Sequence, residues 1–151
     1  MGTIVVGVDG SKGSLAAAQW AAAQAKATDA KVLVLYAVPR SELWSLSAVQ
    51  VNVDKVLAEF TELLEGRWTS SLRKAGVDYS AQVVRGEPAT ELLRVAKRTN
   101  ADMIVLGTKS HGALADLVVG GTVHKIINRT GFPVVLIPTA PPAKKSAAKK
   151  R

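Results

Sequence analysis

The stretch GEPATELLRVAKRTNADMIVLG, residues 86–107, joins a helix to a buried strand with almost nothing between them. Pro88 is typical of the first position of a helix, where its missing N–H needs no partner, and the pattern predicts a helix to about residue 99. ADMIVLG, residues 101–107, predicts a buried strand that ends at Gly107. Buried strands that alternate with helices indicate a parallel sheet covered on both sides.

The sequence before this stretch repeats the pattern. TIVVGV, residues 3–8, and KVLVLYAV, residues 31–38, predict two further buried strands. Residues 13–27 are rich in alanine and predict a helix, whose small side chains would let it lie close to the sheet. Residues 40–52 show no clear period and predict a loop with a short helical turn.

An apolar stripe over residues 53–75 predicts one long helix, for which Gly76 is a good C-terminal stop. Residues 77–84 alternate between apolar and polar side chains, which predicts a strand at the edge of the sheet with one wet face. Further along, residues 122–130 predict a helix and residues 132–138 a last strand that is apolar on both faces.

The predicted order of elements places the chain in the α/β class, as an open parallel sheet with helices on both faces. We expect one domain over residues 1–138, followed by a flexible basic tail over residues 139–151. The formal net charge of +8 belongs largely to this tail. Five of the 20 Lys and Arg residues and none of the 12 acidic residues follow residue 143, so the first 143 residues carry only +3.

Composition excludes several classes of protein. The chain has 151 residues and no cysteine, which excludes disulfides, thiol catalysis and cysteine-ligated zinc, and fits a reducing cytoplasm. No run approaches the ~18 apolar residues of a membrane span. The N-terminal segment has no basic region before its short apolar run, so we expect a strand there and not a signal peptide.

Ligands of open α/β sheets bind beyond the C-terminal ends of the strands. Asp9 follows the first strand, and the glycine-rich stretch GTKSHGALADLVVGGT, residues 107–122, follows the fourth. Backbone N–H groups in such a turn, and at the helix that starts after Gly120 and Gly121, suit phosphate oxygens, and Asp9 could accept from a ribose hydroxyl. The residues thus allow a nucleotide site, but glycines that only make turns explain the same pattern. Neither a G-x-G-x-x-G nor a P-loop spacing is present.

Four motifs resemble the universal stress protein family: IVVGVDGS at residues 4–11, VLYAV at 34–38, the opening stretch, and VHKIINRTGFPVVLIP at 123–138. The resemblance implies a five-stranded parallel, Rossmann-like sheet in the order 3-2-1-4-5, a homodimer, and, in one branch, ATP binding through a G-x-x-G, nine residues, then G-[S/T] pattern. Gly107 and Gly120 match this pattern, whereas Ser110 and Gly121 stand where glycine and Ser or Thr are expected.

By this resemblance Asp9, Ala37, Gly107 and Gly120 carry over as binding residues, with Ala37 contacting adenine through its backbone. The nucleotide-binding residues that we expect are Asp9, Gly10, Ser11, Ala37, Val38, Gly107, Thr108, Ser110, Gly112, Gly120, Gly121 and Thr122. The implied ligand is ATP, or else AMP or a cyclic nucleotide. The only metal role that we expect is a magnesium ion bridging the phosphates near Asp9.

Two functions fit the sequence. The first is a cytoplasmic, ATP-binding regulator of the stress response that changes its partner contacts with its nucleotide. The second is a nucleotide-free dimeric interaction module. The basic tail could aid it on nucleic acid or could serve solubility alone; its charges are Lys144, Lys145, Lys149, Lys150 and Arg151. In both, the apolar edge strand at 133–138 would pair two copies. No catalytic residue is expected, because His111 has no nucleophile elbow beside it. If the protein is an enzyme, we expect no more than slow ATP hydrolysis.

Overall fold

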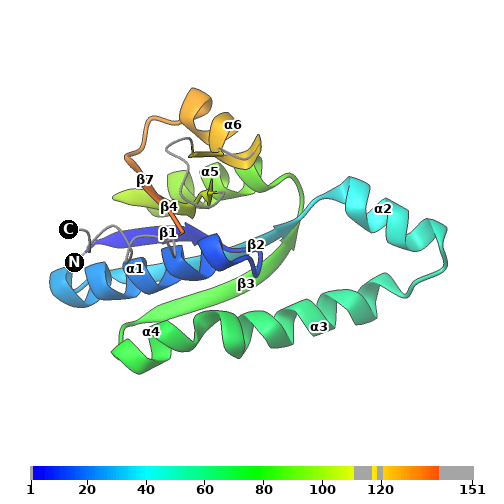
Figure 1. Cartoon of the computed structure of the whole chain (residues 1–151), viewed down its shortest axis with the longest axis horizontal. Helices are drawn as coiled ribbons and strands as arrows, with labels where there is room; N and C mark the ends of the chain where they lie inside the picture. The colour runs from blue at the N-terminus through cyan, green and yellow to red at the C-terminus, as the bar shows by residue number, and fades with distance from the viewer. Residues whose placement is uncertain (1, 111–116, 119–120, 140–151) are drawn as a thin grey trace, which may run out of the picture.

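The computed structural model describes residues 2–110, 117–118 and 121–139. Its main sheet has five parallel strands in the order β3-β2-β1-β4-β7, which confirms the expected order and class (Figure 1). The strands are β1 (Thr3–Gly7), β2 (Lys31–Val38), β3 (Tyr79–Arg85), β4 (Met103–Gly107) and β7 (Val134–Ile137), and a separate antiparallel pair is formed by β5 (Lys109–Ser110) and β6 (Leu117–Val118). The helices are α1 (Lys12–Thr28), α2 (Arg40–Ala48), α3 (Val53–Glu65), the 3-10 turn η1 (Arg67–Thr69), α4 (Ser70–Ala75), α5 (Pro88–Thr99) and α6 (Gly121–Arg129).

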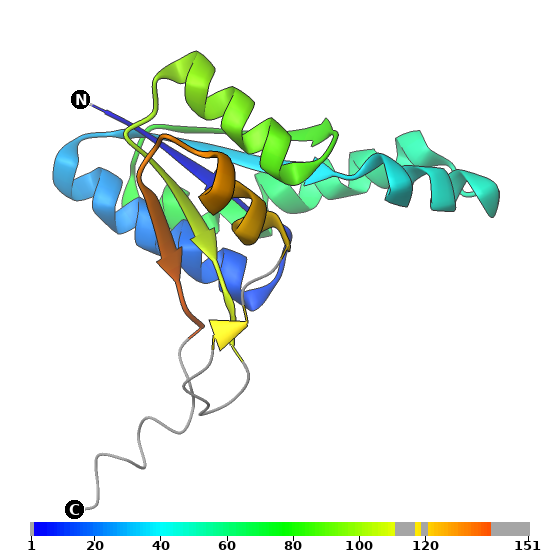
Figure 2. The ribbon, with the colours of Figure 1, turned by 90° about the horizontal axis from the view of Figure 1, so that it is seen from above.

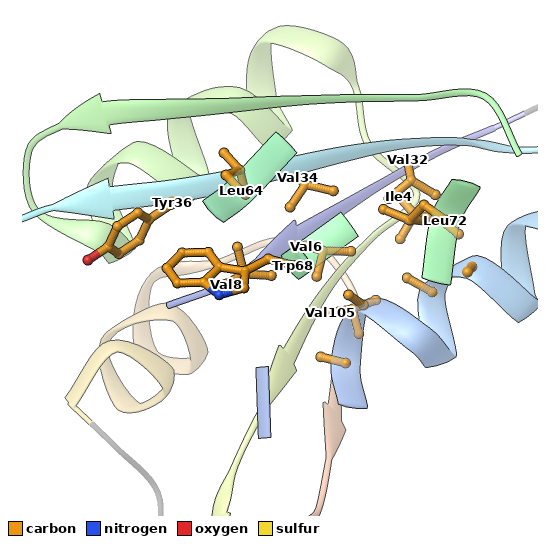
Figure 3. Close-up of a cluster of buried hydrophobic side chains, with 14 of the residues drawn as sticks. Ile4, Val6, Val8, Val32, Val34, Tyr36, Leu64, Trp68, Leu72 and Val105 are labelled. Carbon is orange, nitrogen blue, oxygen red and sulfur yellow. The ribbon is translucent and has the colours of Figure 1, made fainter. Parts of the chain in front are cut away.

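The sheet separates two apolar layers. Helices α1, α3 and α4 cover one face of the sheet, and α5 and α6 cover the other (Figure 1). Because side chains alternate along a strand, Ile4 and Val6 of β1 pack in the first layer and Val5 packs in the second. Figure 3 shows the first layer, where Trp68 packs edge-on against Tyr36 with ring centroids 5.2 Å apart. Both faces are therefore covered, as expected for strands that read as continuous apolar runs.

Helix α1 lies very close to the sheet. Its buried face consists of small residues only: Gly13, Ser14, Ala17, Ala18, Ala21, Ala22 and Ala25. At the N-terminal end the contact becomes backbone to backbone, because a Cβ on Gly107 of β4 would overlap the carbonyl group of Gly13 and lie 2.7 Å from the amide nitrogen of Ser14. Gly107 is thus required by packing, whatever else it does.

Two of the expected elements are wrong. Residues 40–48 form helix α2, not a loop, with Pro39 at its N-cap. Only Leu43 of this helix is buried, so α2 lacks the apolar period that would have revealed it, and with the first half of α3 it projects beyond the sheet (Figures 1 and 2). The predicted helix 53–75 is broken at Gly66, where φ −100° and ψ −89° leave the helical region.

Arg73 closes this break. Its guanidinium donates to the carbonyl oxygen of Glu65 at 2.7 Å, to Thr69 Oγ1 at 2.9 Å and to the hydroxyl of Tyr79 at 3.2 Å, and also to the carbonyl oxygen of Gly66. One side chain thereby satisfies carbonyls at the end of α3 and ties the helix to β3. In the part of the chain that is described, no helix is both long and apolar enough to cross a membrane.

The other expectations are confirmed with shifts of one or two residues at their ends. The alternating segment contains strand β3 at the edge of the sheet. Its residues Val77, Tyr79, Ala81 and Val83 pack on the first layer, and Val84 packs on the second. β7 lies at the opposite edge, with Val135 and Ile137 on one apolar layer and Val134 and Leu136 on the other. The pair β5–β6 inside the glycine-rich stretch was not foreseen.

Candidate functional site

A cavity of about 190 Å³ opens beyond the C-terminal ends of β1, β2 and β4, between α1, α5 and α6. It brings together seven residues that the sequence predicts for a ligand site, namely Asp9, Ser11, Ala37, Gly107, Thr108, Gly121 and Thr122. Eight lining residues were not predicted: Gly7, Val8, Ser14, Leu35, Pro88, Leu92, Leu106 and Val123. Six of these eight have apolar side chains, and we refer to them as the apolar part of the cavity. Asp9, Ser11 and Thr122 are polar and at least partly exposed, and we refer to them as its polar rim.

The loop after β1 is locked by its own hydrogen bonds. Asp9 Oδ1 accepts from the amide of Ser11 at 2.9 Å, and Ser11 Oγ caps α1 by accepting from the amide of Ser14 at 3.2 Å. Ser14 Oγ in turn accepts from the amide of Asp9 at 3.2 Å and donates to the carbonyl oxygen of Ser11 at 3.0 Å. These bonds fix the Asp9 carboxylate, which is the only charged group among the described lining residues, at the rim of the cavity.

Ala37 presents backbone groups to the cavity because β2 extends beyond the last residue of β1. The register of the two strands ends at Gly7 and Leu35. Val8 N donates to Leu35 O at 3.0 Å and Gly86 N donates to Val38 O at 2.9 Å, so odd-numbered residues of β2 face β1 and even-numbered residues face β3. The N–H and C=O of Ala37 therefore point together past the end of β1, as a donor beside an acceptor.

Thr108 carries a polar atom that the fold leaves without a partner. The residue is 2% exposed and lines the cavity, and its Oγ1 is buried with no hydrogen-bond partner in the described structure. Its backbone is fully used, because its amide donates to Ile137 O at 3.0 Å and its carbonyl oxygen accepts from Thr139 Oγ1 at 3.4 Å. A buried unpaired hydroxyl costs free energy, so it is an independent sign of a site that accepts a polar ligand.

The remaining walls come from two helices. Pro88 and Leu92 of α5 supply apolar surface, and Gly121 and Thr122 begin α6 at the cavity. The first N–H groups of α6 have no intrahelical acceptor, and the positive end of the helix dipole lies there. A Cβ added to Gly121 would meet nothing within 4 Å, so this glycine, unlike Gly107, borders open space.

The other predicted site residues do not line the cavity or lie outside the described structure. Val38 is fully buried in the first apolar layer and does not line the cavity. Gly10 adopts φ +85° and lies against Trp68, so its role is in the turn. Ser110 pairs with Leu117 in the β5–β6 ladder. Gly112 and Gly120, together with His111, lie outside the described residues.

Some of the missed residues had a signal in the sequence. Leu35 shares a strand face with Ala37, two positions away, and Ser14 follows the N-cap Ser11 by one helical turn. Pro88 and Leu92 had none, because only the strand order brings α5 beside the ends of β1 and β4.

Comparison with known proteins agrees with this architecture. The chain matches the model of the Universal stress protein family over residues 1–138. Universal stress protein MJ0531 of Methanocaldococcus jannaschii is 30% identical over 141 residues, which cover 89% of this chain and 80% of that protein.

Two solved structures share the fold. The universal stress protein from Archaeoglobus fulgidus in complex with dAMP has a TM-score of 0.67 at 23% identity and covers 91% of this chain and 98% of its own. A universal stress protein in complex with cAMP has a TM-score of 0.61 at 24% identity, with 92% and 98% covered. The match to the family along nearly the whole described domain, on a sheet of the same order, shows that this chain belongs to the universal stress protein family.

Proposed function

We propose that this protein binds an adenine nucleotide in the cavity beyond β1, β2 and β4. The observation that carries the proposal is the paired donor and acceptor of Ala37, held at the apolar part of the cavity beyond the last residue of β1. Adenine offers the complementary pair on one edge, an acceptor at N1 and a donor at its 6-amino group. Guanine offers the opposite pair there, a donor at N1 and an acceptor at O6.

The polar rim suits the rest of a nucleotide. The Asp9 carboxylate would accept from ribose hydroxyls, and the N–H groups of Gly121 and Thr122 would donate to phosphate oxygens. Thr108, whose hydroxyl has no partner among the described residues, lines the same cavity. Further support comes from relatives of the same fold, crystallised with dAMP and with cAMP.

ATP is the nucleotide that we propose, with AMP or a cyclic nucleotide as variants of the same site. A magnesium ion would bridge the phosphates beside Asp9, because a carboxylate and phosphate oxygens are the ligands that it prefers. In keeping with the family, we propose a cytoplasmic regulator of the stress response. Its partner contacts would change with the nucleotide, and it would act as a homodimer through residues 133–138.

Titration calorimetry of the full chain with ATP, GTP and 1-methyl-ATP tests the adenine assignment. Each mismatched ligand loses one or both bonds to Ala37 and leaves its backbone groups unpaired, so we expect affinity at least ~10-fold below that for ATP. Repeating the ATP titration with EDTA tests the magnesium ion. Equal affinity for ATP and GTP would refute the role of Ala37, and no binding of any nucleotide would favour the nucleotide-free interaction module.

A protein-side variant uses Thr108. Thr108→Val keeps the shape of the side chain and removes the unpaired hydroxyl, so the ligand-free protein should be as stable as before or more stable by ~1 kcal/mol. ATP should bind several-fold more weakly if a ligand oxygen is the missing partner. Unchanged affinity in the folded variant would show that the hydroxyl does not serve the ligand.

A further inference from the structure

The carboxylate of Glu87 joins the two helices that wall the cavity. Its Oε1 accepts from the amide of Thr90 at 3.0 Å and from Thr90 Oγ1 at 2.7 Å, and so caps α5. Its Oε2 accepts from Lys125 Nζ of α6 at 3.3 Å, and Arg129 Nη1 lies 3.7 Å from Oε1. Arg129 also donates to Thr90 Oγ1 at 3.4 Å.

The contact with Glu87 lies between α5 and α6, where it can fix the orientation of α6 relative to α5. Lys125 and Arg129 are one helical turn apart, so both face α5 along one side of α6. Val123 and Ile126 of α6 are buried in the same apolar layer as Leu92 of α5, which holds the helices together but does not by itself set their rotation and stagger. The ionic contact with Glu87 adds that constraint.

We refer to the contacts of Glu87 with Lys125 and Arg129 as the Glu87 linkage. The residues next to both of its ends line the cavity. Pro88, the residue after Glu87, lines it on the α5 side. Gly121 and Thr122, one turn before Lys125, line it on the α6 side. The Glu87 carboxylate thus connects the segments that line these two walls. Donors at a helix N-terminus must be placed to within a fraction of an ångström to bind an anion well.

We propose that Glu87 is a positioning residue that, through Lys125 and Arg129, holds the N-terminus of α6 in register for the phosphates of a bound nucleotide. The inference rests on the proposed nucleotide site and adds a residue that does not touch the ligand. The inference is that loss of the Glu87 linkage weakens the binding of the phosphates and leaves the binding of the nucleoside unchanged.

The charge state of Glu87 fits this role. Burial raises the pKa of this carboxyl group, but the hydrogen bonds from Thr90 and Lys125 outweigh that effect and lower the pKa to about 2. The group is therefore ionised at neutral pH. Glu87→Gln keeps an oxygen that can cap α5 and removes the charge that attracts α6.

The test compares ATP with adenosine, which lacks the phosphates, by calorimetry on the full chain. Partly exposed ion pairs are modest, so we expect Glu87→Gln to weaken ATP binding roughly three- to tenfold. Adenosine affinity should change less than twofold. Arg94→Gln is the matched control, because Arg94 pairs with Glu91 of α5 at 2.7 Å, and that pair lies within one helix. It should leave both affinities unchanged.

A double-mutant cycle with Lys125→Gln separates linkage from independent effects. The variant that carries both changes should bind ATP no more weakly than Glu87→Gln alone, because Glu87→Gln already removes the charge with which Lys125 pairs. Independent, multiplying losses would overturn the proposal. So would equal losses for ATP and adenosine, which indicate general destabilisation.

Amide hydrogen exchange of the ligand-free protein gives a readout that needs no nucleotide. Glu87→Gln should speed exchange at Lys125 and the residues that follow it in α6, because the amides before Lys125 belong to the first turn and lack an intrahelical acceptor, and it should leave β1 and β2 unchanged. If the unaltered chain binds no ATP, the proposed function fails and the assignment of phosphate affinity fails with it. If the unaltered chain binds ATP but Glu87→Gln changes neither exchange in α6 nor the ratio of ATP to adenosine affinity, only the role of Glu87 is refuted.

Discussion

Gly107→Ala should destabilise the ligand-free protein, although Gly107 lies in a stretch that looks dedicated to a ligand. The added methyl group would overlap the backbone of Gly13 and lie 2.7 Å from the amide nitrogen of Ser14, where 3.4 Å is the lower limit of ordinary contact. The obstacle is backbone on the first turn of α1, so no side chain can rotate away. The helix must move off the sheet by several tenths of an ångström or more.

The cost follows from what that movement disturbs. Ala17, Ala18 and Ala21 of α1 are fully buried, and lifting the helix opens gaps beneath them. Overpacking in a core typically costs 1–3 kcal/mol, and the rigid obstacle places this variant near ~3 kcal/mol. For a chain of this size that corresponds to a fall of roughly 6–12 °C in Tm.

Urea unfolding followed by circular dichroism measures the effect, and Gly121→Ala is the matched control. A Cβ on Gly121 meets nothing within 4 Å, and alanine favours a helix over glycine by up to ~1 kcal/mol, so its unfolding free energy should be unchanged or higher. If Gly107→Ala unfolds within ~0.5 kcal/mol of the unaltered protein, the close contact between α1 and β4 is not what requires glycine there.

Three further predictions concern stability and assembly. Arg73→Ala should lower the unfolding free energy by ~1–3 kcal/mol in thermal denaturation, because the carbonyls at the end of α3 lose their donor, whereas Lys74→Ala, at an exposed neighbour, should have little effect. Burial, aided by the charges of Glu42 and Asp9, raises the pKa of Tyr36 from 10.0 to about 12. The unfolded chain then loses its proton first, so the contribution of Tyr36 to stability is complete below pH 10 and falls as the pH rises towards 12; an absorbance titration in which this phenol ionises at its ordinary pKa would contradict this. The chain should have the mass of a dimer in light scattering at micromolar concentration, because β7 is an apolar edge strand, and a monomeric mass would argue against pairing through it.

Some features could be predicted because they depend on short segments alone. A strand that packs on both faces needs an uninterrupted apolar run, and such runs predict the strands at residues 103–107 and 134–137. Along β3, half-buried and exposed residues largely alternate, which indicates one solvent-facing side and is typical of a strand at the edge of a sheet. Helix α2 escaped prediction because it buries a single residue, Leu43, and so has no period to detect.

The sequence by itself determined the succession of strands and helices, the family, and the strand ends at which a ligand could bind, because apolar periodicity and local motifs are properties of neighbouring residues. Only the tertiary structure decided what each of those residues faces. Gly107 and Gly121 both line the cavity, but only Gly107 is required by the packing of a helix against the sheet. Val38 lies in the core, whereas its neighbour Ala37 lines the cavity. Such assignments depend on contacts between residues that are far apart in the sequence. Gly13 contacts Gly107, Thr108 contacts Thr139, and Glu87 contacts Lys125, and no local sequence pattern predicts these pairs.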